Sequence, residues 1–87
     1  MIMDKRWCSF IIPCYNIEKE ISVMLDSILN QTFSDFRIVC VEDCSTDNTL
    51  EVIRKYEQEH QDNIVVIQNQ MNFGAGKSRN IGFDYAV

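Results

Sequence analysis

An apolar run that ends in two acidic residues constrains this sequence more than any other stretch. Residues 38–41 read Ile-Val-Cys-Val, and Glu42 and Asp43 follow directly. β-Branched residues without polar alternation suit a strand covered on both faces, so the run predicts a buried parallel strand. The two carboxylates then lie at the carboxyl end of that strand, where ligands bind in open α/β sheets. We expect both to face outward and to contact a ligand.

The rest of the sequence alternates between strand and helix patterns. Three strands are expected, at residues 7–12, 37–42 and 64–67. Three helices are expected, at residues 18–30, 49–59 and from 76 onward. Pro13 is expected to end the first strand, and the capping-box spacing of Asn48 and Glu51 predicts the start of the second helix. Crossovers of this length give parallel strands, which predicts an α/β fold: a Rossmann-like open sheet in three layers.

Length, charge and composition exclude several classes of protein. The 87 residues allow one small domain, residues 1–87, and the net charge of -5 gives no basic surface for nucleic acid. No apolar run approaches the ~18 residues of a membrane span, and the start is too polar for a secretory signal. We therefore expect a cytoplasmic protein. The four cysteines form no CxxC pair, so Cys8 and Cys40 are interpreted as small buried residues on neighbouring strands rather than disulfide or zinc sites.

Three turns are predicted to meet at one edge of the sheet, at residues 13–16, 42–45 and 72–76. They offer the aromatic ring of Tyr15, the carboxylate of Asp43 and the exposed backbone amides around Gly74. A nucleoside would use such groups: the ring stacks on a base, the carboxylate accepts from a base N–H or a ribose hydroxyl, and amides or an arginine contact phosphate. Arg79, in the first turns of the last helix, is expected to reach the same edge. Each residue alone has an ordinary structural explanation, whereas their convergence favours a binding site.

Two other phosphate-related sites fit the sequence less well. Residues 76–78 read Gly-Lys-Ser, the end of a GxxxxGK[ST] phosphate loop, but Met71 occupies the place of the leading glycine. A receiver-like signalling domain would need a phosphorylatable aspartate after the third strand, where residues 68–70 read Gln-Asn-Gln. No GxGxxG follows the first strand, so a dinucleotide fold is not supported either.

Three segments together resemble family 2 glycosyltransferases. Residues 9–16 (SFIIPCYN) resemble the opening strand of that family, residues 31–49 (QTFSDFRIVCVEDCSTDNT) resemble its QT..D.EIIVVDDGSTDNT segment, and residues 72–82 (NFGAGKSRNIG) are similar to its N.G.s.ARN.G segment. Their order and spacing also match. The resemblance implies a GT-A fold, in which a Rossmann-like half binds a nucleotide-sugar and a second half binds an acceptor. It further implies sugar transfer from a nucleotide diphosphate donor, usually UDP-linked, assisted by Mg²⁺ or Mn²⁺.

The resemblance also assigns roles by position. It implies that Pro13 and Tyr15 line the nucleoside pocket and that Asp43 accepts a hydrogen bond from the base. Glu18 and Arg79 are further candidates for nucleotide-sugar binding. The family's DxD metal motif lies on a fourth strand and its catalytic base follows later, so no catalytic or metal-binding residue is assigned here. We therefore expect this chain to bind no metal, to be inactive alone, and to be the N-terminal part of a longer enzyme.

The alternative is a non-catalytic binding or dimerisation module that retains this half-fold. Such a module would form a homo-oligomer through the exposed edge of its sheet. A DxD segment encoded soon after residue 87 would favour the enzyme, and a stop codon there would favour the module. Members of the family often build cell-surface polysaccharides, which implies peripheral association of a full-length protein with the inner face of the membrane.

Overall fold

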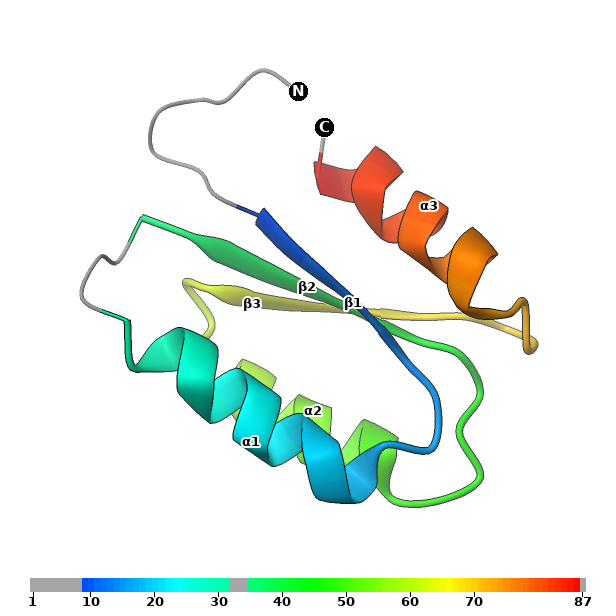
Figure 1. Ribbon diagram of the computed structural model, residues 1–87, viewed down its shortest axis with the longest axis horizontal. Helices are drawn as coiled ribbons and strands as arrows, with labels where there is room; N and C mark the ends of the chain where they lie inside the picture. Colours follow the sequence, from blue (N-terminus) through cyan, green and yellow to red (C-terminus); the bar gives the residue numbers. More distant parts are fainter. Residues whose placement is uncertain (1–8, 32–34, 87) are drawn as a thin grey trace.

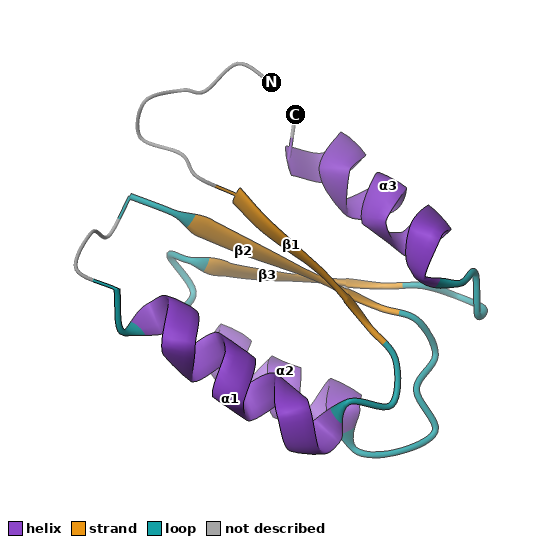
Figure 2. Cartoon of the chain, in the orientation of Figure 1, coloured by secondary structure: helices purple, strands orange, loops and turns teal. Residues whose placement is uncertain are grey.

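The computed structural model describes residues 9–31 and 35–86, which form one open parallel sheet flanked by helices (Figure 1). The strands are β1 (Ser9–Cys14), β2 (Arg37–Glu42) and β3 (Ile64–Gln68), in the spatial order β1-β2-β3. The helices are α1 (Glu18–Leu29), α2 (Thr49–Glu59) and α3 (Ala75–Ala86). Figure 2 shows α1 and α2 together on one face of the sheet and α3 on the other. This arrangement confirms the predicted three-layer α/β fold.

The central strand β2 is buried on both faces, as its apolar run predicts. Four consecutive side chains of β2 are completely buried: Ile38, Val39, Cys40 and Val41. On one side of the sheet, α1 and α2 contribute buried apolar residues to the core. On the other side, α3 approaches very closely at Gly82, where an added Cβ would lie 2.6 Å from Ile11 Cγ2. Only a residue without a side chain allows the helix to pack at this distance.

The first strand does not end at Pro13 as predicted. β1 continues to Cys14, and Pro13 is paired with Val41 in the parallel register. Proline is tolerated because, within residues 9–31 and 35–86, β1 lies at the edge of the sheet, where a missing N–H need not break the sheet's hydrogen bonds. Trp7 and Cys8, which were assigned to this strand, lie outside the described residues.

The predicted capping box at the start of α2 is wrong in detail. Asn48 occupies the N-cap position, but its side chain makes no capping hydrogen bond. Asp47 takes this role, since its Oδ1 accepts hydrogen bonds from the backbone N–H and the hydroxyl of Thr49. The cap is thus supplied one residue earlier than the spacing predicts.

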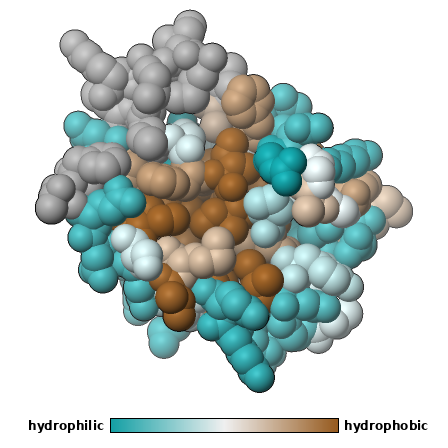
Figure 3. Space-filling view, in the orientation of Figure 1, coloured by the Kyte–Doolittle hydropathy of each residue, from teal (hydrophilic) through white to brown (hydrophobic). Residues whose placement is uncertain are grey.

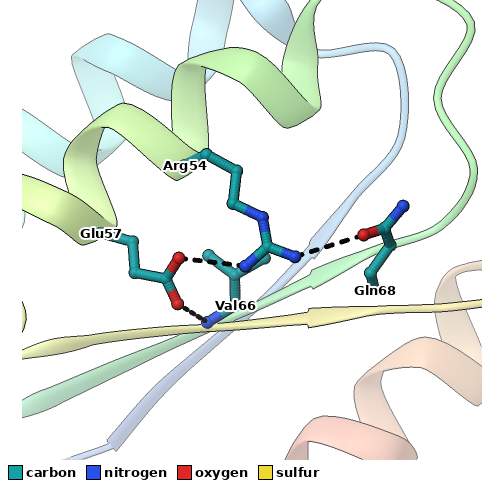
Figure 4. A network of polar contacts seen from close by, with 4 residues as sticks. All are labelled: Arg54, Glu57, Val66 and Gln68. Carbon is teal, nitrogen blue, oxygen red and sulfur yellow. Dashed lines mark hydrogen bonds and ion pairs between the residues drawn. The ribbon is translucent and has the colours of Figure 1, made fainter.

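The outer edge of β3 is partly closed by side chains of α2 (Figure 4). The N–H of Val66 donates to Glu57 Oε2 at 3.3 Å, so this group is not open to another strand. Arg54 holds the carboxylate in place, because its Nη1 lies 3.0 Å from Glu57 Oε1 and its Nη2 lies 3.2 Å from Gln68 Oε1. The surface differs on the side of the sheet where β1 lies. Hydrophobic side chains gather in the middle of the face shown in Figure 3, which β1 crosses in Figure 1.

Two further expectations concern thiols and membranes. Cys14, Cys40 and Cys44 are free thiols, and Cys8 lies outside the described residues. A hydrogen bond with the Cys40 thiol and burial both raise the pKa of Cys14, which keeps it a protonated, unreactive thiol. Within residues 9–31 and 35–86, no helix is both long and apolar enough to span a bilayer.

Candidate functional site

The loops that follow the three strands meet at the carboxyl end of the sheet and form a pocket of about 280 Å³. The end of β1 and each of the three loops contribute to its lining, which includes Pro13, Tyr15, Ile17, Asp43, Asn72 and Gly74. The structure therefore brings together three of the residues proposed from the sequence: Pro13, Tyr15 and Asp43. Tyr15 is 46% exposed as a residue, so its side chain remains available to a ligand.

Asp43 is turned inward, contrary to the expectation that it faces outward. Only 2% of the residue is exposed. Its Oδ1 accepts hydrogen bonds from the N–H of Phe73 at 2.7 Å and from Asn69 Nδ2 at 3.0 Å, and its Oδ2 accepts from the N–H of Gly74 at 2.8 Å. These donors lie 26 to 31 residues away in the sequence. Asp43 therefore fixes the loop after β3 against the end of β2.

The donors around Asp43 also set its charge and its remaining binding capacity. Burial raises the pKa of Asp43, but the N–H groups of Phe73, Asn69 and Gly74 and the hydroxyl of Ser78 outweigh burial and bring the pKa below 3.8. The group is thus an ionised carboxylate at neutral pH. A carboxylate has about four acceptor sites, two on each oxygen. Two of the N–H donors lie on Oδ1 and one lies on Oδ2, so Oδ2 is the less occupied oxygen.

Glu42 is also buried rather than outward-facing, and it serves its own loop. It is 2% exposed. Its Oε2 accepts from the N–H of Cys44 at 3.0 Å, and its Oε1 accepts from the N–H of Ser45 at 2.9 Å. The carboxylate stabilises a turn in which Cys44 has a φ of +61°, in the left-handed region. Glu42 is therefore a structural neighbour of the site and does not line the pocket.

The β1–α1 loop is attached to the β2–α2 loop through Asn16 and Glu18. Asn16 Oδ1 accepts from the N–H of Thr46 at 2.8 Å. Glu18 Oε1 accepts from the N–H of Asn48 at 3.3 Å. Glu18, proposed from the sequence as a ligand contact, thus holds a neighbouring loop and is absent from the pocket lining.

Arg79 and the Gly-Lys-Ser segment lie beside the pocket rather than in its lining. Arg79 is exposed in the first turns of α3. Lys77 places its Nζ 4.3 Å from the centre of the Phe73 ring. The Ser78 side chain is completely buried, and its Oγ accepts from Asn69 Nδ2 at 3.0 Å. A serine in this position cannot serve a phosphate loop, so that alternative is not supported.

Sequence reasoning missed the contribution of Asn69 and Ser78 to this site. Asn69 directly follows β3 and is 7% exposed. A polar residue at the carboxyl end of an apolar strand is the same signal that identified Glu42 and Asp43, so Asn69 could have been predicted from the sequence. Ser78 gave none, because its role depends on how α3 docks.

The described residues do not supply a metal-ligand set. Among residues 9–31 and 35–86, no three His, Cys, Asp or Glu side chains are grouped so as to hold a metal ion. The carboxylates of Asp43 and Glu42 are instead occupied by N–H donors. No metal ligand is therefore assigned within these residues.

Comparison with known proteins finds glycosyltransferases, both by a family model and among individual relatives. A family model described as "Glycosyl transferase family 2" matches residues 9–87. A poly(ribitol-phosphate) beta-glucosyltransferase of Bacillus spizizenii is 44% identical over 75 residues, which cover 83% of this chain and 12% of that protein. The poly(ribitol-phosphate) beta-N-acetylglucosaminyltransferase TarS of Staphylococcus aureus is 42% identical over 81 residues, covering 90% of this chain and 14% of TarS. The chain thus spans about an eighth of the length of these relatives.

Solved structures match the fold as well as the sequence. Residues 1–349 of S. aureus TarS in complex with UDP-GlcNAc match with a TM-score of 0.82 and 40% identity, covering 93% of this chain and 23% of that one. A mannosyltransferase of Pyrobaculum calidifontis in complex with GDP-Man and Mn²⁺ matches with a TM-score of 0.83 and 26% identity, covering 94% of this chain and 24% of that one. Both comparisons extend over nearly all of the present chain.

Proposed function

Since the chain belongs to glycosyl transferase family 2, a family of transferases, we propose that its described residues bind the nucleoside of a nucleotide-sugar donor, for transfer of the sugar to an acceptor hydroxyl. One observation carries this proposal. Pro13 near the end of β1, Tyr15 in the loop after β1 and Asp43 in the loop after β2 line a single pocket at the carboxyl end of the sheet. This is the edge where open α/β sheets bind nucleotides.

The chemistry of the pocket suits a base. Its volume of about 280 Å³ is at the lower end of ligand pockets, which suits one part of a larger donor. The exposed ring of Tyr15 offers a stacking surface. Oδ2, the less occupied oxygen of Asp43, is offered as an acceptor to a base N–H, and uracil carries such a group at N3. Asp43 therefore holds the loop after β3 in place and also accepts a hydrogen bond from the base.

The donor is proposed to be UDP-linked. TarS, at 40% identity, forms complexes with UDP-GlcNAc and with UDP, which supports this choice. Arg79 and Glu18 lie outside the pocket lining, and we keep both as candidates for the part of the donor that extends beyond it. The relatives named above act on poly(ribitol phosphate), which supports a role in building a cell-surface polysaccharide.

A calorimetric titration of UDP into the 87-residue chain, with Mn²⁺ and with EDTA, tests the proposal. We expect weak binding that is the same in both conditions, because the described residues supply no metal-ligand set. Tyr15→Ala should weaken binding about tenfold or more, since stacking on one base contributes about 1–3 kcal/mol. Tyr85→Ala is the matched control, because Tyr85 is similarly exposed (49%) but lies near the end of α3.

Two results would contradict the proposed function. The first is an absence of binding heat from a chain that circular dichroism shows to be folded. The second is an equal loss of affinity in Tyr15→Ala and Tyr85→Ala, which would show that the aromatic ring at the pocket has no special role.

A further inference from the structure

We propose that Asn69 and Ser78 form a positioning pair that fixes the direction of the Asp43 carboxylate, so that Oδ2, its less occupied oxygen, is presented to the N–H of a uracil base. The inference rests on the proposed function, since it concerns how the same pocket recognises its ligand. It adds two residues that do not line the pocket and that act through Asp43.

Asn69 is held rigidly at the end of the sheet. Its own N–H donates to the carbonyl oxygen of Glu42 at 2.8 Å, which continues the β2–β3 pairing by one residue. Its Nδ2 donates to Asp43 Oδ1 and to Ser78 Oγ, both at 3.0 Å. A carboxylate only accepts hydrogen bonds, so the amide must turn its nitrogen toward Asp43. Both amide hydrogens of Asn69 are then used.

Ser78 completes the arrangement from the opposite layer of the fold. It lies in the first turn of α3, where its N–H donates to the carbonyl oxygen of Gly74 at 3.0 Å. Gly74 in turn donates its N–H to Asp43 Oδ2. The hydroxyl is buried and receives the second amide hydrogen of Asn69. Ser78 therefore couples the orientation of Asn69 to the loop that contacts Asp43.

The consequence for Asp43 is a fixed division between its two oxygens. Asn69 and the N–H of Phe73 fill both acceptor sites of Oδ1. A carboxylate whose Oδ1 is filled in this way cannot rotate without losing two hydrogen bonds, of which the one from Asn69 is buried. Without the Asn69 amide, each oxygen carries one N–H donor, and a ligand N–H no longer meets one defined acceptor. The pair thus determines selectivity for a ligand N–H more than the general affinity of the pocket.

This role is tested by comparing UDP with UDP methylated at N3, which lacks the N–H. Dissociation constants of both compounds would be measured for the 87-residue chain and for Asn69→Ala, Ser78→Ala and Gln70→Ala. The wild type should prefer UDP by about tenfold or more, the value of one hydrogen bond to a charged acceptor. Asn69→Ala should bring the ratio close to one, and Ser78→Ala should lower it by about threefold as Asn69 loses one partner. Gln70→Ala, an exposed neighbour, should keep the wild-type ratio.

The outcomes separate the inference from the proposed function. If the wild type does not bind UDP, or binds both compounds equally, the assignment of Asp43 to the base fails and the positioning role fails with it. If the wild type discriminates and both variants keep its ratio while losing overall affinity, the pair is merely structural and the inference alone is overturned. Should Asn69→Ala prove unfolded by circular dichroism, the ratio for Ser78→Ala decides, because that change removes only one oxygen.

Discussion

Two regions of this molecule use a carboxylate to hold backbone N–H groups, yet their surroundings differ. At the carboxyl end of the sheet, Asp43 is 2% exposed and receives N–H groups from Phe73, Gly74 and Asn69, with no cation among these donors. At the outer edge of β3, the side chain of Glu57 is 28% exposed, accepts one N–H from Val66 and pairs with Arg54.

The comparison shows why one region can recognise a ligand while the other closes an edge. A buried charge must be compensated by several well-placed donors, and these donors also fix its direction. An exposed charge keeps much of its hydration, so its hydrogen bond contributes little to stability. Glu57 instead occupies a strand N–H that would otherwise be open to another chain. The same type of contact therefore organises a pocket in one place and limits association in the other.

The largest difference between the regions should appear on truncating the buried carboxylate. Asp43→Ala leaves three N–H donors without their acceptor, and each buried unpaired donor costs about 1–3 kcal/mol. We expect the free energy of unfolding, measured by urea denaturation, to fall by about 3 kcal/mol or more. A loss below about 1 kcal/mol would mean that the loop after β3 does not depend on Asp43.

A smaller loss is expected from the adjacent carboxylate. Glu42→Gln keeps one acceptor oxygen but turns an amide NH₂ toward the N–H of either Cys44 or Ser45. The free energy of unfolding should fall by about 1–2 kcal/mol in the same urea experiment. UDP affinity should change much less than in Asp43→Ala. Equal losses of affinity in the two variants would show that the pocket does not distinguish the two carboxylates.

Acidification should reveal the buried carboxylate in the pH dependence of stability. Because the pKa of Asp43 lies below 3.8 in the folded chain, its stabilisation is fully present above pH 3.8 and is lost as the pH falls through the lower, folded pKa. The pKa of Asp47 is also lowered, chiefly by the Thr49 hydroxyl, so the wild type must be compared with Asp43→Asn. Thermal melts between pH 5 and 2 should show a shallower decline for the variant; parallel curves would refute the assignment.

The smallest effect is expected at the β3 edge. Glu57→Gln removes the charge that faces Arg54 and should change the free energy of unfolding by less than about 1 kcal/mol. Hydrogen exchange at the Val66 amide should nevertheless accelerate, since a neutral amide replaces the carboxylate and the hydrogen bond from the Val66 N–H becomes weaker. Glu59→Gln, an exposed change on the same helix, is the control. Unchanged exchange at Val66 would show that Glu57 does not protect this edge.

Sequence patterns predicted the elements of this fold more reliably than its contacts. The unbroken apolar run of β2 predicted a strand buried on both faces, because such a run places apolar side chains on both faces of a strand. The extent of β1 through Pro13 was not predicted, since proline is tolerated only once the strand is known to be an edge. Capping of α2 by Asp47 rather than Asn48 depends on side-chain rotamers that spacing alone does not determine.

For the site, the sequence predicted which loops meet but not how the carboxylates point. Pro13, Tyr15 and Asp43 do line one pocket, because the carboxyl ends of parallel strands share an edge. Asp43 was expected to face outward because its donors lie 26 to 31 residues further along the chain, and the local sequence does not predict such distant contacts. Asn69 and Ser78 were missed for the same reason, as their contacts exist only after α3 docks.

The most direct test of the central claim is a titration of UDP followed in ¹H–¹⁵N spectra of the chain. If Asp43 anchors a loop that receives the base, the amide signals of Tyr15, Phe73 and Gly74 should shift in a saturable way with one common dissociation constant. The amide of Val66, held by the other carboxylate, should not move. Shifts centred on Val66, or no saturable shift at the three loop amides of a folded chain, would contradict the account.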